Sequence, residues 1–330
     1  MAGKNRLNMI VIDAGGRYGI HPTWKTVKGD LAYYLFEPDA QEAERLSKKY
    51  QNRKDEITVK SMALGDKDGE MRLDIFKNKA MSSSAKRTNI SSLFQGQREE
   101  EVSIIKSVIC PVTTIDTFCD ENSISPDFLK LDTEGSEFEI LQGAEKALKN
   151  SVLAVRSEVA FDYIFEGKKL FNDIHEYLME NNFFLMNLDY RGAGDYQVDQ
   201  VRYDEPHGIL TSTDAVWVKR FSEILTPHGT LLEKTENVVK LATFCFLNNS
   251  PDVSLRLLLE AIYNEDIKLS LLEHTQSYRR LDKLIHEHFY RLKWCPGQSL
   301  IVNSELYFRI FGKEMKVLNE FMEDLALNPE

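Results

Sequence analysis

Residues 8–19 read NMIVIDAGGRYG, an apolar run that meets an acidic residue and then a group of glycines. A continuous apolar run of this length is typical of a strand buried on both faces of a parallel sheet. The glycines allow a sharp turn after it and let the backbone approach a ligand closely. Ligands of open α/β sheets bind beyond the carboxyl ends of the strands. The sequence therefore predicts a ligand site directly after Asp13.

The spacing of the glycines favours S-adenosylmethionine over NAD as that ligand. A dinucleotide fingerprint requires GxGxxG, whereas Gly15, Gly16 and Gly19 follow an alanine at position 14. Asp13 would repel a pyrophosphate, but it suits the ammonium group of an amino acid. An ordinary tight turn between a strand and a helix would explain the glycines equally well.

Apolar runs alternate with amphipathic helical segments over the first two thirds of the chain. Strands are expected at residues 8–14, 31–36, 57–64, 71–76, 128–131, 152–160, 183–188 and 215–218, and helices at 40–51, 134–148 and 170–181. This alternation predicts an α/β layer fold with a mostly parallel sheet. The Ser- and Lys-rich residues 77–101 are expected to form a long loop.

Length and pattern predict two domains within the 330 residues. From about residue 221 the periodicity becomes wholly helical, at residues 237–247, 253–263, 267–290 and 313–327. We therefore expect a sheet domain at 1–220 and an all-helical C-terminal extension at 221–330. The role of this extension does not follow from the sequence.

Composition argues against several classes of protein. No apolar run approaches the ~18 residues of a membrane-spanning helix, and residues 1–7 are too short for a signal peptide. A net charge of −11 argues against non-specific nucleic-acid binding. Four cysteines without CxxC spacing favour reduced thiols over zinc or disulfides. The sequence thus predicts a cytoplasmic protein with neither a membrane span nor a bound metal.

Two segments near the glycine turn are candidates for binding a nucleoside. Glu37, in FEPD, ends the second expected strand, where a carboxylate can accept hydrogen bonds from both ribose hydroxyls. Both NAD and S-adenosylmethionine enzymes use this device. Leu64 and Asp66 lie at the edge of the third strand and could line an adenine slot, although a simple turn is an equally good interpretation.

Three acidic residues are candidates for the reacting end of the site. Asp132 and Glu134 follow the strand at 128–131 and could accept or orient a hydroxyl proton. Glu158 lies near the end of the next expected strand, at 152–160, and could form a wall of the acceptor site. For Glu137 we prefer a structural role, because acids stabilise the N-terminus of a helix.

The histidines are weaker candidates. His21 lies just after the glycine turn and could be a base or an acceptor contact, but lone histidines are more often structural. His207 is a weaker candidate still. His286 and His288 are two residues apart on an expected helix and thus on different faces, so they do not form a metal pair.

Taken in order, the motifs resemble the FkbM family of S-adenosylmethionine-dependent methyltransferases over roughly residues 8–220. The motifs are VIDAGGRYG, FEPD, MALGDKDG, ISSLF, VTTIDTF, DFLKLDTEGSEFEILQGA, SEV and LFNDIHEYLMENNFFLMNLD. The resemblance implies a Rossmann-like class I methyltransferase sheet and O-methylation of a sugar or other small hydroxylated acceptor. It also implies that Asp132 and Glu134 lie beside the methyl group and that the cofactor is contacted by Asp13, Gly15, Gly19, Glu37, Leu64 and Asp66.

The chain departs from the family pattern in and after the glycine turn. Arg17 and Tyr18 are large where small residues are usual, and Pro22 interrupts the helix that normally follows. Because proline breaks a helix interior, that helix should be short or displaced.

Three functional hypotheses remain open from the sequence. The first is in-line methyl transfer to a hydroxyl of a sugar or other small acceptor. The second is a nicotinamide oxidoreductase, which Asp13 and the alanine at position 14 disfavour. The third is a non-catalytic nucleoside-binding scaffold whose helical extension docks a protein partner or a second copy of the chain.

Overall fold

The computed structural model describes residues 8–25, 27, 31–88, 100–189, 211–225, 229–262, 264 and 266–267. They belong to two compact units, residues 7–224 and residues 225–330 together with the first six. His207, His286, His288, residues 89–99 and the helix expected at 313–327 lie outside the described residues, as does nearly all of the helix expected at 267–290.

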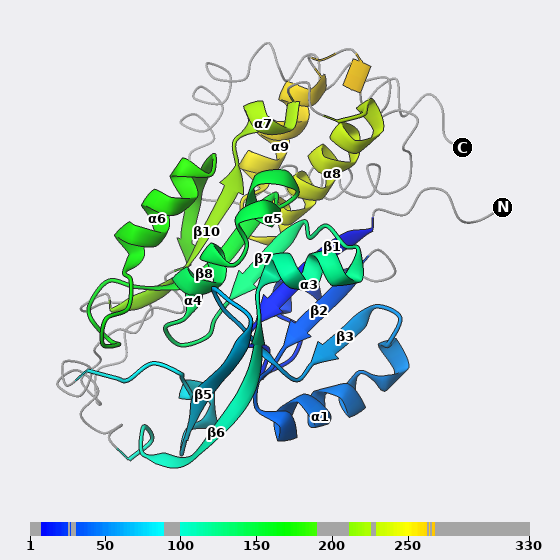
Figure 1. Ribbon diagram of the computed structural model, residues 1–330. Helices are drawn as coiled ribbons and strands as arrows, with labels where there is room; N and C mark the ends of the chain where they lie inside the picture. Colours follow the sequence, from blue (N-terminus) through cyan, green and yellow to red (C-terminus); the bar gives the residue numbers. More distant parts are fainter. Residues whose placement is uncertain are drawn as a thin grey trace, which may run out of the picture. The chain divides into compact units, whose positions relative to one another are not determined.

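Seven strands of the first unit form the main sheet, in the order β3-β2-β1-β7-β8-β10-β9 (Figure 1). The strands are β1 Met9–Ala14, β2 Leu31–Phe36, β3 Ile57–Lys60, β7 Phe128–Leu131, β8 Ala154–Ala160, β9 Phe183–Asp189 and β10 Ser212–Lys219. All neighbours are parallel except that β10 is antiparallel to both β8 and β9. The expected mostly parallel α/β sheet is confirmed.

One face of the main sheet is apolar and covered by helices. These are α3 Ile115–Asn122, α4 Glu137–Gln142, α5 Glu145–Asn150 and α6 Phe171–Glu180, which Figure 1 shows along one side of the strands. Ile12, Leu129 and Trp217 of the sheet share a buried cluster with Phe118 of α3 and Leu178 of α6. This core fixes the strand ends that carry the candidate site.

The opposite face carries charges in register. Asp13 of β1 pairs with Lys130 of β7, and Lys130 pairs with Arg156 of β8. Registered partners on neighbouring strands point to the same face.

After β1 comes the 3-10 helix η1 Pro22–Trp24, whose Trp24 ring lies 5.1 Å from that of Phe128. A short helix at this place agrees with the expected effect of Pro22.

A second sheet has the order β4-β6-β5, with β4 Ala63–Leu64, β5 Gly69–Phe76 and β6 Ile104–Thr113. The single strand expected at 57–64 is therefore wrong, since β3 ends at Lys60 and β4 belongs to another sheet. Neither β6 nor α3 was predicted. The side chains of β6 are mostly exposed, including Ile105 and Ile109, so they lack a clear alternation of apolar and polar residues.

The helix expected at 134–148 is also wrong, because it begins at Glu137 and is divided into α4 and α5. Glu134 has a positive φ of 58° and cannot belong to a right-handed helix. The Glu137 carboxylate accepts hydrogen bonds from the Thr133 nitrogen at 2.6 Å and the Gly135 nitrogen at 3.0 Å. It thereby closes the turn before α4, in agreement with a structural role for Glu137.

Further helices complete the first unit. Asp39 directly precedes α1 Ala40–Lys49, and its side chain accepts from the Gln41 nitrogen and caps the helix. The 3-10 helix η2 Gln51–Arg53 follows it, and η3 Lys79–Met81 comes after β5. α7 Phe221–Leu225 follows β10.

The second unit contains the hairpin of α8 Leu231–Leu247 and α9 Pro251–Ile262. Thr230 and Glu233 form a capping box at the N-terminus of α8, in which the side chain of each accepts from the backbone nitrogen of the other. The buried Ser254 hydroxyl donates to the Ala242 carbonyl at 2.7 Å and joins the two helices. No helix in the described part of the chain is both long and apolar enough to cross a membrane.

Candidate active site

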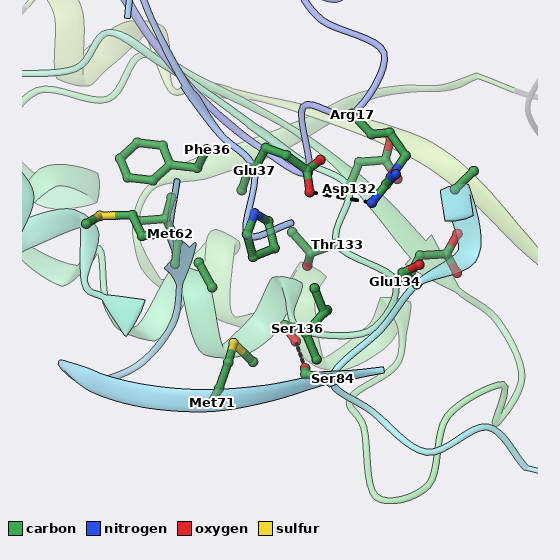
Figure 2. A pocket seen from close by; sticks show the side chains of 18 of the residues that line it. Arg17, Phe36, Glu37, Met62, Met71, Ser84, Asp132, Thr133, Glu134 and Ser136 are labelled. Atoms are coloured by element: carbon green, nitrogen blue, oxygen red, sulfur yellow. Dashed lines mark hydrogen bonds and ion pairs between the residues drawn. The ribbon is translucent and has the colours of Figure 1, made fainter. Parts of the chain in front are cut away.

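A pocket opens beyond the carboxyl ends of β1, β2 and β7 (Figure 2). One part of its lining is apolar and comes from Phe36, Met62, Leu64 and Met71. The other part is charged and comes from Arg17, Glu37, Asp132 and Glu134. Ligands of open α/β sheets bind at this edge, so the pocket lies where the sequence predicts a ligand site.

Glu37 directly follows β2 and is only 3% exposed. Its Oε1 accepts from the Asp39 nitrogen at 2.9 Å and lies 3.6 Å from Nη2 of Arg17. Burial raises the pKa of Glu37 to about 7, although the Arg17 guanidinium works in the opposite direction. The carboxyl is thus oriented by its neighbours and titrates near neutral pH.

Gly15 places the backbone of the glycine turn against the end of β7. It has a φ of +84°, and a Cβ there would lie 1.7 Å from the carbonyl oxygen of Asp132. Its nitrogen donates to the Phe36 carbonyl at 3.1 Å. Only glycine fits this conformation and spacing. Gly15 therefore joins the ends of β1, β2 and β7 at the pocket.

The Asp13 carboxylate pairs with the ammonium group of Lys130, a residue of the chain itself. The carboxylate is fully buried, accepts a hydrogen bond from the Tyr33 hydroxyl, and has Oδ1 3.2 Å from Nζ of Lys130. The same Nζ lies 3.1 Å from Oδ2 of Asp132. Burial opposes protonation of Lys130, but the two carboxylates raise its pKa above the usual value. Lys130 is thus a fixed positive charge beneath Asp132.

Glu134 is held at the pocket by a partly buried ion pair. Nη2 of Arg87 donates to Oε2 of Glu134 at 2.8 Å, and the two side chains are 10% and 20% exposed. Burial raises the pKa of Glu134 to about 7 against the effect of Arg87, and the charges of Asp132 and Glu137 add to the rise. A carboxyl group with such a pKa can exchange a proton near neutral pH.

Glu158 and His21 lie near the charged end of the pocket but are not among its lining residues. Burial, followed by the charges of Glu134 and Asp132, raises the pKa of Glu158 well above its usual value. Burial and the charge of Arg156 lower the pKa of His21 to about 4. His21 is therefore neutral at neutral pH, and its Nδ1 accepts from the Thr23 nitrogen at 3.4 Å.

The structure brings together five of the nine predicted site residues, since Gly15, Glu37, Leu64, Asp132 and Glu134 line one pocket. Asp13 is buried with Lys130 instead. Gly19 packs against the hydroxyl of Tyr50, and Asp66 is exposed on a turn. With Glu158, these residues lie outside the lining.

Sequence reasoning missed Arg17, Lys130 and Arg87 as parts of the site. Lys130 precedes Asp132 by two residues, a strand spacing that places both side chains on one face and could have been noticed. Arg87 lies in a polar segment without any such signal. Among the described residues, no group of His, Cys, Asp and Glu side chains is arranged to hold a metal ion.

The strand order, with an antiparallel strand inserted next to the edge and a pocket beyond β1, β2 and β7, defines an α/β protein of the class I methyltransferase type. Residues 13–185, more than half of the chain, match the model of the methyltransferase FkbM domain. The chain belongs to the FkbM methyltransferase family, as its motifs indicate.

The solved structures that match this chain are distant in sequence. Methyltransferase FkbM from Methylobacillus flagellatus KT is 16% identical, with a TM-score of 0.39, and the match covers 66% of this chain and 45% of that one. This chain thus spans less than half of that relative. Sp1610 of Streptococcus pneumoniae, a putative tRNA (m1A22) methyltransferase, is 9% identical with a TM-score of 0.33, covering 85% and 95% of the two chains.

A third structure is TrmK of M. capricolum in complex with S-adenosyl-homocysteine. It is 12% identical with a TM-score of 0.30, and the match covers 84% of this chain and 91% of that one. The comparison with curated proteins found no significant match.

Proposed function

We propose that the chain is an S-adenosylmethionine-dependent O-methyltransferase that acts on a hydroxyl group of a sugar or another small acceptor. One observation carries this proposal above the others. A single pocket joins Glu37, a carboxyl suited to a ribose, with Asp132 and Glu134, two carboxyls suited to proton transfer. This is the arrangement needed to hold a nucleoside cofactor at one end and a reacting hydroxyl at the other.

The chemistry of the residues that line the pocket suits this cofactor. The Glu37 carboxylate would accept hydrogen bonds from the ribose hydroxyls, and Phe36, Met62 and Leu64 would contact the adenine. Asp132 and Glu134 would face the positive sulfonium. When bound, S-adenosylmethionine supplies a methyl group that is already activated for transfer.

The remaining chemistry belongs to the side chains of this protein. We assign Glu134 as the base that takes the proton of the acceptor hydroxyl, because a base with a pKa near the operating pH is the most effective. Lys130 fixes the orientation of Asp132, which would hold the hydroxyl at attacking distance. Glu158 would form the acceptor side of the site.

The structure gives two reasons to prefer this function to the alternatives. The turn after β1 has no glycine at position 14, and its Arg17 side chain lies at Glu37. In dinucleotide-binding proteins the pyrophosphate lies over the glycine turn that follows the first strand. The turn of this chain lacks the first fingerprint glycine and carries Arg17, so it disfavours NAD. A nucleoside-binding scaffold, in turn, would not require a carboxyl with a pKa of about 7, that of Glu134, at the opposite end of the pocket.

Replacement of Glu37 with Gln is expected to weaken the binding of S-adenosylhomocysteine at least tenfold. A carboxylate accepts from both ribose hydroxyls, whereas an amide offers a single acceptor oxygen. Calorimetric titration with S-adenosylhomocysteine, with NAD as the parallel ligand, measures this change. Glu44→Gln is the matched control, because Glu44 is exposed on α1 and pairs with Lys48. Binding of NAD in place of S-adenosylhomocysteine would favour the oxidoreductase hypothesis.

The affinity for S-adenosylhomocysteine is expected to fall as the pH decreases from 8 to 6. Burial raises the pKa of Glu37 to about 7, so the free carboxyl takes up a proton in this range. A protonated carboxyl accepts fewer hydrogen bonds, and bound ribose hydroxyls therefore favour the ionised form. Titrations at several pH values would show the trend. An equally strong trend in Glu37→Gln would assign it to another group.

A further inference from the structure

Residues 82–88 cross the turn between β7 and α4 and are attached to it at two points. The Ser83 hydroxyl donates to the carbonyl oxygen of Glu134 at 2.5 Å, and Ser83 is fully buried. The hydroxyls of Ser84 and Ser136 are 2.9 Å apart, and Figure 2 marks this hydrogen bond with a dashed line. This segment therefore has a fixed position beside the candidate base.

The far end of the same segment is attached to residues 163–166. The Thr88 nitrogen donates to the Ile164 carbonyl at 3.0 Å, and the Glu166 nitrogen donates to the Lys86 carbonyl at 2.8 Å. The guanidinium carbon of Arg87 lies 4.9 Å from the centre of the Phe165 ring. Stacking on an aromatic ring favours a fixed plane for the guanidinium. Arg87 is thus held on one side by Phe165 while it pairs with Glu134 on the other.

The charges around Glu134 come from four parts of the chain. Asp132 follows β7, Glu137 begins α4 and Glu158 belongs to β8, and all three are acidic. Arg87, from residues 82–88, brings the positive charge that pairs with Glu134. Lys130, the neighbouring cation, is held by Asp13 and Asp132. Of these neighbours, Arg87 favours the ionised form of Glu134, whereas the acidic residues oppose it.

We propose that Arg87 is a positioning residue of the methyl-transfer site, which fixes the Glu134 carboxylate at the pocket and keeps it available as a base. This inference rests on the proposed function. It adds Arg87 to the site as the side chain that sets the charge of Glu134. Lys86 is its neighbour in sequence, but it pairs with Glu166 and both side chains are exposed.

Two probes that differ in one charge can report the state of Glu134. S-Adenosylmethionine carries a positive sulfonium and S-adenosylhomocysteine a neutral thioether, so the ratio of their affinities depends on the charge of the carboxyls that face the sulfur. Removal of Arg87 would leave Glu134 with acidic neighbours. An opposite charge at this distance lowers the pKa of a carboxyl by about 1–3 units. Its removal should therefore shift the titration of Glu134 towards higher pH.

The experiment is calorimetric titration of the full chain with each probe between pH 6 and 8.5. For the unaltered chain, we expect the affinity ratio to change with a midpoint near the pKa of Glu134, which is about 7. In Arg87→Gln the midpoint should move upward by about 1 unit or more. Arg87→Lys should restore part of the shift, and Lys86→Gln should leave the midpoint unchanged.

The possible results separate this inference from the proposed function. An unchanged midpoint in Arg87→Gln and Arg87→Lys, with both probes still bound, would overturn the role of Arg87 and leave the cofactor site intact. An equal shift in Lys86→Gln would assign the effect to general charge and would also overturn it. If the unaltered chain bound neither probe, the proposed function would fail and the inference with it. If Arg87→Gln does not fold, Arg87→Lys decides the question. Because it should restore only part of the shift, a smaller upward shift of the midpoint is expected in it, and an unchanged midpoint would overturn the inference.

Discussion

Replacing Lys130 with methionine is expected to destabilise the first unit, residues 7–224, by about 3–5 kcal/mol. The substitution leaves the fully buried carboxylate of Asp13 without the ammonium group 3.2 Å away. A buried charge whose partner has been removed is far more costly than an intact pair. Urea unfolding followed by tryptophan fluorescence would measure the change in the free energy of unfolding.

A double variant distinguishes this explanation from a simple loss of packing. Asp13→Asn combined with Lys130→Met removes both charges, and we expect it to recover most of the lost stability. Lys106→Met is the matched control, because Lys106 is exposed on β6 and should change stability by less than about 0.5 kcal/mol. If the double variant were as unstable as Lys130→Met alone, the charge pair would not be the cause.

Replacing Glu134 with Gln is expected to lower kcat by about 10²–10⁴-fold, the usual contribution of a general base. The binding of S-adenosylhomocysteine should change by less than about threefold, because general-base catalysis acts on the chemical step. Turnover would be followed on an acceptor found by screening hydroxylated sugars. Glu139→Gln is the control, since Glu139 belongs to α4 and pairs with Lys168.

The pH dependence of the same reaction gives a second criterion. Glu134 must be ionised to accept a proton, so kcat should rise with pH through the pKa of about 7. This rise of kcat with pH should be absent from Glu134→Gln. Unchanged turnover in Glu134→Gln would remove Glu134 as the base. Retained turnover after both Asp132→Ala and Glu134→Ala would refute the carboxylate mechanism as a whole.

The sequence was a good guide to the strands that form the centre of the main sheet. β1, β2 and β7 are continuous apolar runs followed by acidic or glycine residues. In the structure each run is a strand, and each strand ends directly before those residues. For the same reason the positions of Glu37, Asp132 and Glu134 at one edge of the sheet follow from the order of the strands and their ends. Parallel strands bring their carboxyl ends together whatever the sequence between them.

The parts that were missed depend on contacts between distant segments. β6 has few buried side chains, and its identity comes from pairing with β5 and β4. The start of α4 is set by Glu137, which closes a turn that a helical pattern cannot reveal. Arg87 meets Glu134 across 47 residues of chain. No periodicity in the sequence encodes such a pair.

The position of β10 has a consequence for the order in which the chain acquires its structure during synthesis. β10 is made last, yet it lies between β8 and β9. A ribosome therefore delivers β9 before the strand to which it hydrogen-bonds, and the sheet cannot close until residue 219 has emerged. Until then β8 exposes an unpaired edge, a template for wrong pairing. Fragments that end at residue 185, where the family match stops, would retain that open edge permanently.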